Sequence, residues 1–244
     1  MCRKLLFLLS VPALCIIMAF APAAKSPRLL VFSLTKAYHH ASIAAGNRAV
    51  VQLGREYGFT ADTTTDAGVF NDKSLNQYAA VLFLNTTGDV LNDEQQDAFI
   101  RFIRNGGGFA GVHAATDTEF DWPWFGQLAG AYFTNHPKQQ EAIVQVAGPG
   151  DASTKHLPLQ WKKKDEWYNF RDIQPGLQIL LTVDESSYTG GQNGALHPIS
   201  WKRKFDGGRS FYTALGHTEE SYTDPLFLRH LAMGIVYALG KGGE

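Results

Sequence analysis

A histidine occupies the centre of a sharp turn that is expected to follow a buried strand. Residues 106–117 have the sequence GGGFAGVHAATD, which predicts the end of a helix, a strand and then a turn at His113. Small residues around His113 give the pattern of a nucleophile elbow, whose centre is usually serine or cysteine. We expect this turn to expose the imidazole. Because imidazole is a proton carrier or metal ligand near neutral pH, the segment favours acid–base or metal chemistry over acyl transfer.

Other histidines lie beside carboxylates or aromatic residues in predicted loops. Such a composition is typical of proton-transfer and metal sites. We predict that His113 is a catalytic base oriented by Asp117, and that His217 or Glu166 is the opposing acid. The candidate substrate-binding residues in these loops are His39, His40, His136, Trp167, Tyr168, His197 and Glu219.

Several of these candidates also have a structural interpretation. Asp117 could cap a helix that follows the turn, and Trp167 and Tyr168 could belong to an exposed pair of strands. His156 and His230 lack comparable neighbours and are interpreted as structural. The sequence contains no HExxH motif, so no cofactor is certain, and a divalent metal would have to be held by dispersed histidines.

The first 24 residues have the pattern of a secretory signal peptide. Two basic residues precede an apolar run over residues 5–20, and APAA at 21–24 offers small side chains for cleavage. An uncleaved membrane anchor is the alternative, although the run is short for a span. Cleavage would remove Cys2 and Cys15 and leave no thiol. We therefore expect an exported protein, periplasmic or extracellular, with no stable membrane insertion after cleavage.

The charge composition argues against a nucleic-acid partner. The chain has 22 basic and 23 acidic side chains, and loss of the two basic residues near the N-terminus leaves a net charge of −3. A short basic run at 162–164 is better explained as a solvated strand edge. Five tryptophans favour a small-molecule carbohydrate as partner, because sugars stack on aromatic rings. The composition leaves open whether the protein is an oligomer.

Strands and helices are expected to alternate in the first half of the chain. The strand at 79–84 is apolar without alternation, which is typical of parallel strands covered on both faces. Strand–helix alternation at this spacing predicts a parallel sheet with right-handed crossovers, whose ligands lie at the carboxyl ends of the strands. Strands are predicted at 28–33, 59–63, 79–84 and 108–112, and helices at 42–57 and 93–104.

The second half has a different pattern, with connections rich in glycine, proline and aspartate. We predict one α/β domain over residues 25–244, whose later part adds antiparallel strands and long loops. The predicted strands are 141–146, 177–183, 198–202 and 210–214, and a final helix is predicted at 226–239.

In this order, the polar segments resemble the trehalose-utilisation (ThuA-like) family. The resemblance covers nearly all of residues 25–244. It implies a flavodoxin-like, class I glutamine amidotransferase-like fold with a mostly parallel sheet, helices on both faces, and His113 in place of the cysteine. It also implies a role in sugar catabolism, including oxidised 3-keto glycosides. The matching segments are residues 38–43, 106–117, 121–124, 135–137, 165–168, 197–201 and 208–217.

Together these patterns favour an exported enzyme of carbohydrate catabolism. It would act on a glycoside or keto-sugar by histidine acid–base chemistry, with metal assistance as an option. The reaction class would be isomerase, lyase or hydrolase, and not thiol amidotransferase. A non-catalytic carbohydrate-binding module and an amidotransferase-like scaffold for protein interactions remain as alternatives.

Overall fold

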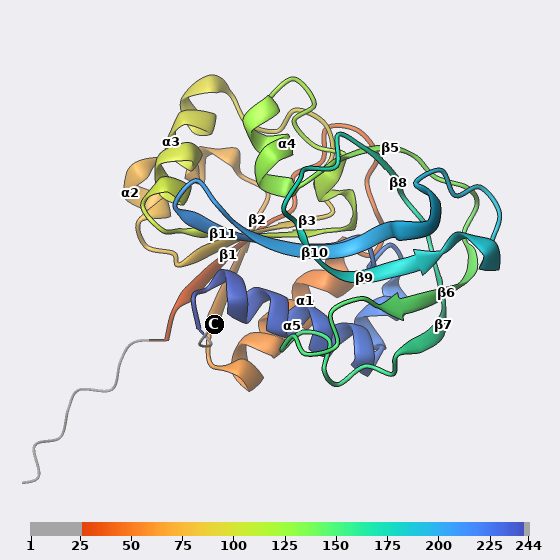
Figure 1. Cartoon of the computed structure of the whole chain (residues 1–244). Coiled ribbons are helices and arrows are strands. Elements are labelled where there is room, and N and C mark those ends of the chain that lie inside the picture. The colour runs from red at the N-terminus through yellow and green to blue at the C-terminus, as the bar shows by residue number, and fades with distance from the viewer. Residues whose placement is uncertain (1–25, 242–244) are drawn as a thin grey trace, which may run out of the picture.

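A nine-stranded sheet runs through the centre of the computed structural model, which describes residues 26–241 (Figure 1). The predicted signal peptide lies outside these residues. Within them, no helix is both long enough and apolar enough to cross a membrane. The strand order across the sheet is β2-β1-β3-β4-β11-β10-β9-β6-β7.

Five neighbouring strands form the parallel part of the sheet. Strands β3 and β4 are buried along their whole length, because helices cover both faces of this region (Figure 1). The four predicted strands of the first half are confirmed within one or two residues. The parallel strands are β1 (Arg28–Phe32), β2 (Thr60–Thr64), β3 (Ala80–Leu84), β4 (Gly108–Val112) and β11 (Gly208–Thr213).

The helices form a layer on each face of the sheet, with α1 (Ile43–Tyr57) and α5 (Pro225–Ala238) on one face (Figure 1). Gly58 ends α1 in the left-handed conformation, at a φ of 75°. A capping box between Asn92 and Gln95 begins α3. The opposite layer contains α2 (Asp72–Leu75), α3 (Asp93–Arg104) and α4 (Pro123–Ala129).

The remaining strands of the sheet are antiparallel, as the second half of the sequence predicts. They are β10 (His197–Phe205), β9 (Gln178–Asp184), β6 (Gln140–Val146) and β7 (Gln160–Asp165). Strand β7 is the edge strand and contains the basic run 162–164, so the interpretation of that run as a strand edge is confirmed. A separate pair consists of β5 (Tyr132–Asn135) and β8 (Asn169–Arg171).

Short 3₁₀ turns connect several of these elements, and two of them follow strands that end near the candidate site. They are η1 (Ala67–Val69), η2 (His113–Thr116), η3 (Glu185–Ser187), η4 (Gly194–Leu196) and η5 (Glu219–Thr223).

Aromatic rings fill the core between the parallel strands and the layer of α2, α3 and α4. The ring of Phe83 lies 5.3 Å from that of Phe32, 5.7 Å from that of Phe99 and 5.3 Å from that of Phe125. All four side chains are fully buried. Burial of each ring contributes roughly 1.5–3 kcal/mol. The residues described contain no cysteine, so this core and the sheet hold the strand ends in place.

Candidate active site

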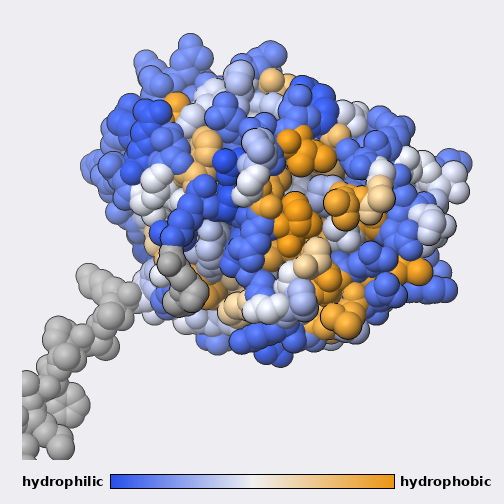
Figure 2. All heavy atoms as spheres, viewed as in Figure 1, coloured by the Kyte–Doolittle hydropathy of each residue, from blue (hydrophilic) through white to orange (hydrophobic). Residues whose placement is uncertain are grey.

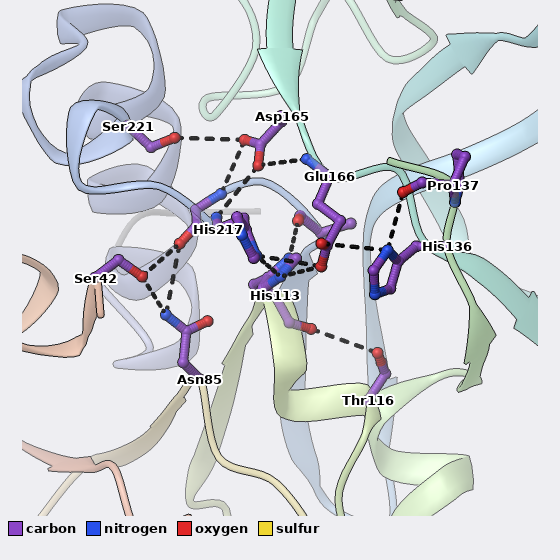
Figure 3. Close-up of polar contacts among 12 residues, drawn as sticks. Ser42, Asn85, His113, Thr116, His136, Pro137, Asp165, Glu166, His217 and Ser221 are labelled. Atoms are coloured by element: carbon purple, nitrogen blue, oxygen red, sulfur yellow. Dashed lines mark hydrogen bonds and ion pairs between the residues drawn. The ribbon is translucent and has the colours of Figure 1, made fainter. Parts of the chain in front are cut away.

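The carboxyl ends of three parallel strands bring three histidines together. His40 lies in the loop after β1, His113 directly follows β4, and His217 lies in the loop after β11. Glu166 directly follows β7 at the far edge of the sheet and reaches back to the histidines (Figure 3). Ligands of open α/β sheets lie at this edge.

His113 occupies a strained turn, as the elbow pattern predicts. Its φ is 49°, a left-handed value that is uncommon for a residue with a side chain. The expected exposure is wrong, because His113 is fully buried. The ring of Tyr168 lies 4.2 Å from the imidazole, and those of His40 and His217 both lie 4.9 Å away. The turn therefore directs the ring into an enclosed cluster.

A backbone carbonyl determines the tautomer of His113. The Nδ1 atom lies 2.8 Å from the carbonyl oxygen of Ala214. Because a carbonyl oxygen can only accept, Nδ1 must carry the hydrogen, and Nε2 of the neutral ring presents a lone pair. This is the arrangement by which proteins commonly orient a metal-binding histidine. The predicted orienting role of Asp117 is therefore wrong, since Ala214 takes that position.

Nε2 of His113, Nδ1 of His217 and Oε2 of Glu166 lie close together. Nε2 of His113 lies 3.0 Å from Nδ1 of His217 and 3.4 Å from Oε2 of Glu166, and the latter two atoms are 3.2 Å apart. Burial alone would raise the pKa of Glu166, but hydrogen bonds from both histidines outweigh it and hold this pKa well below its usual range. The carboxyl is therefore ionised, and a proton or a metal ion must lie among these atoms.

His40 completes the group as a neutral imidazole. Burial, followed by the nearby His113 and His217, lowers the pKa of His40 to about 3. Its Nδ1 atom is buried and has no hydrogen-bond partner. One ligand atom from each of His40, His113, Glu166 and His217 lies within 4.8 Å of all the others. Three imidazoles and a carboxylate suit a divalent transition metal such as zinc, so this group could hold one.

Asp165 positions the loop that carries His217, and the sequence analysis missed it. Its buried carboxylate accepts hydrogen bonds from the backbone N–H groups of Gly216 at 3.2 Å and His217 at 3.3 Å, and from Ser221 Oγ at 3.4 Å (Figure 3). A second carboxylate directly before Glu166 was the available signal. Asp165 therefore fixes the backbone beside the metal-binding candidates.

His136 lies at the other oxygen of Glu166. Its Nδ1 atom is 3.2 Å from Oε1, and its side chain is 39% exposed (Figure 3). Asp117 acts electrostatically on the same histidine. Burial raises the pKa of Asp117 to about 6, although His136 partly opposes this shift. Glu166 therefore links the buried histidines to a more accessible acid–base pair.

Three predicted substrate-binding residues are buried and cannot contact a sugar directly. Trp167 is 1% exposed, and its Nε1 donates to the carbonyl of Gln140. His197 is enclosed between Glu185 Oε1 and the carbonyl of Tyr168, each 2.8 Å from a ring nitrogen. Tyr168 is 2% exposed and supports the His113 ring. The predictions for these three residues are corrected, because the sequence pattern does not show that their side chains point into the interior.

A small hollow of about 200 Å³ opens onto the histidine cluster. His40 and His217 line it, together with the exposed Glu219. The predicted substrate-binding residue His39 is exposed and hydrogen-bonded to Thr35, and it does not line this hollow. Of the predicted substrate-binding residues, His40 and Glu219 therefore lie at the hollow, and His136 lies at Glu166.

The larger hollow, about 960 Å³, lies elsewhere, between α5 and the antiparallel strands. It is lined by several lysines and by Phe211 and Tyr237, and contains no histidine. Figure 2 shows apolar side chains among hydrophilic ones on the face that carries α5 and β10. We place the candidate site at the smaller hollow, because it alone of the two is lined by histidines of the cluster.

The sheet and its helix layers form a class I glutamine amidotransferase-like α/β fold, with a histidine in the turn after β4. This fold is similar to that of a GMP synthase subunit from Thermoplasma acidophilum, at 10% identity and a TM-score of 0.50, covering 88% of this chain and 96% of the other. The chain belongs to the ThuA family, described as trehalose utilisation, which matches residues 28–238. No curated protein matches the chain.

Two solved ThuA-like proteins are similar over most of both chains. One, from Bacteroides uniformis, is 25% identical with a TM-score of 0.73, covering 90% of this chain and 95% of the other. The second, from Parabacteroides merdae, is 20% identical with a TM-score of 0.75, covering 90% and 92%. A β-galactosidase from Bacillus circulans shares the fold in a part of its length, at 13% identity and a TM-score of 0.54, covering 89% of this chain and 31% of the other.

Proposed function

We propose that this protein is a metal-dependent enzyme that acts on a glycoside or keto-sugar. The observation that carries the proposal is the convergence of His113 Nε2, His217 Nδ1 and Glu166 Oε2 within 3.4 Å of one another. A purely structural cluster would pair each lone pair with its own donor. Here one backbone carbonyl accepts from Nδ1 of His113, so Nε2 can meet the carboxylate and His217 only through a shared proton or a metal ion.

A divalent metal can take the place of that proton and would give the cluster a function. His40, His113, Glu166 and His217 would be its ligands, and Ala214 and Asp165 would hold two of those ligands in orientation. A bound metal supplies a Lewis acid that polarises a carbonyl oxygen. Because His40 and His217 line the small hollow, substrate would approach from there.

Proton transfer is assigned to His136 and Asp117. His136 is the most accessible imidazole that contacts Glu166, and the carboxyl of Asp117, with its pKa of about 6, can stabilise the imidazolium that forms. In a 3-keto glycoside, His136 would remove the proton from the carbon between the ketone and the anomeric carbon. The electron pair forms an enolate, and its collapse expels the glycosidic oxygen, which takes up a proton and leaves a C=C bond.

The carbohydrate-binding module loses its main support in the structure. Of the aromatic residues that could stack on a sugar in that alternative, Trp167 and Tyr168 are buried. The low pKa of Glu166 and the high pKa of Asp117 place two carboxyls with divergent acidities around one histidine, which is typical of catalytic sites.

The test is to incubate the metal-loaded protein with 3-keto-trehalose and follow products by NMR. We expect turnover by the wild type and a loss of at least about a hundredfold in His136→Ala. His113→Ala should lose both turnover and bound metal, whereas the control His39→Ala should retain both. Equal turnover by wild type and His113→Ala would contradict the proposal.

We also propose that the protein acts outside the cytoplasm. The support is the basic, apolar and small-residue pattern of residues 1–24 alone.

A further inference from the structure

The hollow beside the histidine cluster is assembled from both halves of the chain. The loop after β1 contributes Tyr38 and His40, and the loop after β11 contributes His217 and Glu219. Gln139 closes it from the segment before β6. Its volume of about 200 Å³ suits a single sugar ring.

Tyr38 presents an aromatic ring at this hollow on a fixed backbone. Its side chain is 64% exposed, and its ring lies 4.7 Å from that of His40 at an interplanar angle of 81°. Thr87 holds the backbone, since its hydroxyl donates to the Tyr38 carbonyl at 2.9 Å and its carbonyl accepts from Lys36 N–H at 2.8 Å. An exposed ring on a fixed backbone is suited to stacking against the apolar face of a ligand.

The charges around the hollow have one sign. Glu219 and Glu220 line it and are exposed, and Glu166 lies behind its histidines. The residues that line it include no lysine or arginine. Lys164 acts electrostatically on Glu220 but does not line the hollow. These three carboxylates outnumber the two positive charges of a bound divalent metal, so a phosphorylated or carboxylated ligand would still meet repulsion here. Carboxylates readily accept hydrogen bonds from hydroxyl groups.

We propose that this hollow binds one uncharged sugar ring, with Tyr38 as its stacking surface and Glu219 as an acceptor for its hydroxyl groups. The substrate class is thereby narrowed to neutral sugars and to glycosides with a neutral terminal ring. The assignment rests on the proposed carbohydrate-active function, and it adds a specificity that the metal cluster alone does not provide.

Calorimetric titration of the metal-loaded protein with trehalose, glucuronate and glucose 6-phosphate tests this assignment. We expect trehalose to bind and the two anions to bind at least about tenfold more weakly. Tyr38→Ala should weaken trehalose binding about tenfold, while Tyr38→Phe keeps it. Phe120→Ala is the matched control, because Phe120 is also an exposed aromatic residue but does not line the hollow.

Glu219→Gln together with Glu220→Gln should narrow the difference between trehalose and the anions. Absence of trehalose binding, equal binding of the anions by the wild type, or an unchanged affinity in Tyr38→Ala would overturn the assignment. Trehalose binding that depends on Tyr38, without turnover of the keto-glycoside, would instead contradict the proposed catalysis and leave the subsite standing. Bound metal in each variant, measured by elemental analysis, separates loss of the subsite from loss of the cluster.

Discussion

The two carboxylate oxygens of Glu166 face different histidines. Oε2 faces the buried His113 and His217, whereas Oε1 faces the half-exposed His136. Because hydrogen bonds from the buried pair keep its pKa low, Glu166 stays ionised well into acidic conditions. Among the carboxyls near this site, it is Asp117 whose pKa burial raises, to about 6.

Replacement of Asp117 by asparagine should change the pH profile of the reaction. Asp117 ionises at a pKa of about 6, and only the ionised form can stabilise a cationic His136. Turnover of the wild type should therefore fall as the pH drops below about 6. In Asp117→Asn we expect lower turnover without that acidic limb, measured as kcat/KM between pH 5 and 8. If kcat/KM of the variant still falls below about pH 6, a group other than Asp117 causes that fall.

For single residues, the sequence predicted the types of side chain in the site better than it predicted their contacts. The elbow at His113 and its histidine partners follow from residue type and position after strands. Trp167 and His197 were assigned wrongly because a linear pattern does not show which way a side chain points in a bent segment. The role of Ala214 was unpredictable, because only its backbone carbonyl takes part.

The ends of the strands hold the backbone of the candidate site in position. The backbone after β11 is held by Asp165 at the end of β7, although the two strands lie far apart in the sheet. Since the carboxylate contacts the N–H of His217 itself, the position of His217 depends on the edge strand β7.

Asp165→Asn should weaken metal binding about 10- to 100-fold, which is the usual effect of removing a group that orients a ligand. We expect a lower kcat with a smaller change in KM, measured at limiting metal, with partial recovery at high metal. Asp184→Asn is a suitable control, because Asp184 also accepts from a backbone N–H, that of Ser186, in an exposed turn away from the histidines. Identical metal affinities in wild type and Asp165→Asn would refute the positioning role.

Helix α5 contains a buried histidine with a structural role, as expected from the sequence. His230 contacts the Ser153 carbonyl and Ser200 Oγ, and burial lowers its pKa to about 4. Between about pH 4 and 6.5 the unfolded chain binds a proton at this residue that the folded protein does not, so His230 reduces stability as the pH falls.

His230→Gln should remove this pH-dependent contribution to the free energy of unfolding. The variant should be less stable than the wild type at pH 7.5, and the gap should narrow towards pH 4.5 by about 2 kcal/mol or less. Urea unfolding at both pH values measures the gap. A constant difference would show that His230 does not titrate in this way.

The two halves of the sheet differ in how far the sequence predicts them. The parallel strands β1, β3 and β4 are mainly apolar runs beside clear helix signals, so they are predicted within one residue. The end of β10, at 203–205, was missed because these residues become strand only by pairing with β11. Strands β5 and β8 have four and three residues and pair only with each other, so no local pattern marks them.

At the scale of the whole molecule, an amidotransferase-like fold carries a histidine in the turn after β4. The mature chain, with a net charge of −3, would have no thiol and would depend on its aromatic core rather than on disulfides.

Export gives a separate prediction. In a bacterial host, the full chain should appear in the periplasmic or extracellular fraction with residues 1–24 removed, because the apolar run is too short for a stable anchor. Cell fractionation with intact-mass analysis measures both properties, and a version beginning at residue 25 after an initiator methionine should stay in the cytoplasm. An uncleaved product in the membrane fraction would support the anchor instead.

Titration of zinc into the metal-stripped protein, followed by calorimetry, tests the metal centre most directly. We predict one saturable site per chain in the wild type and in His39→Ala, and loss of that site in His217→Ala and Glu166→Gln. Absence of saturable binding in the wild type, or the same affinity in all four proteins, would contradict a metal held by the histidines at the strand ends.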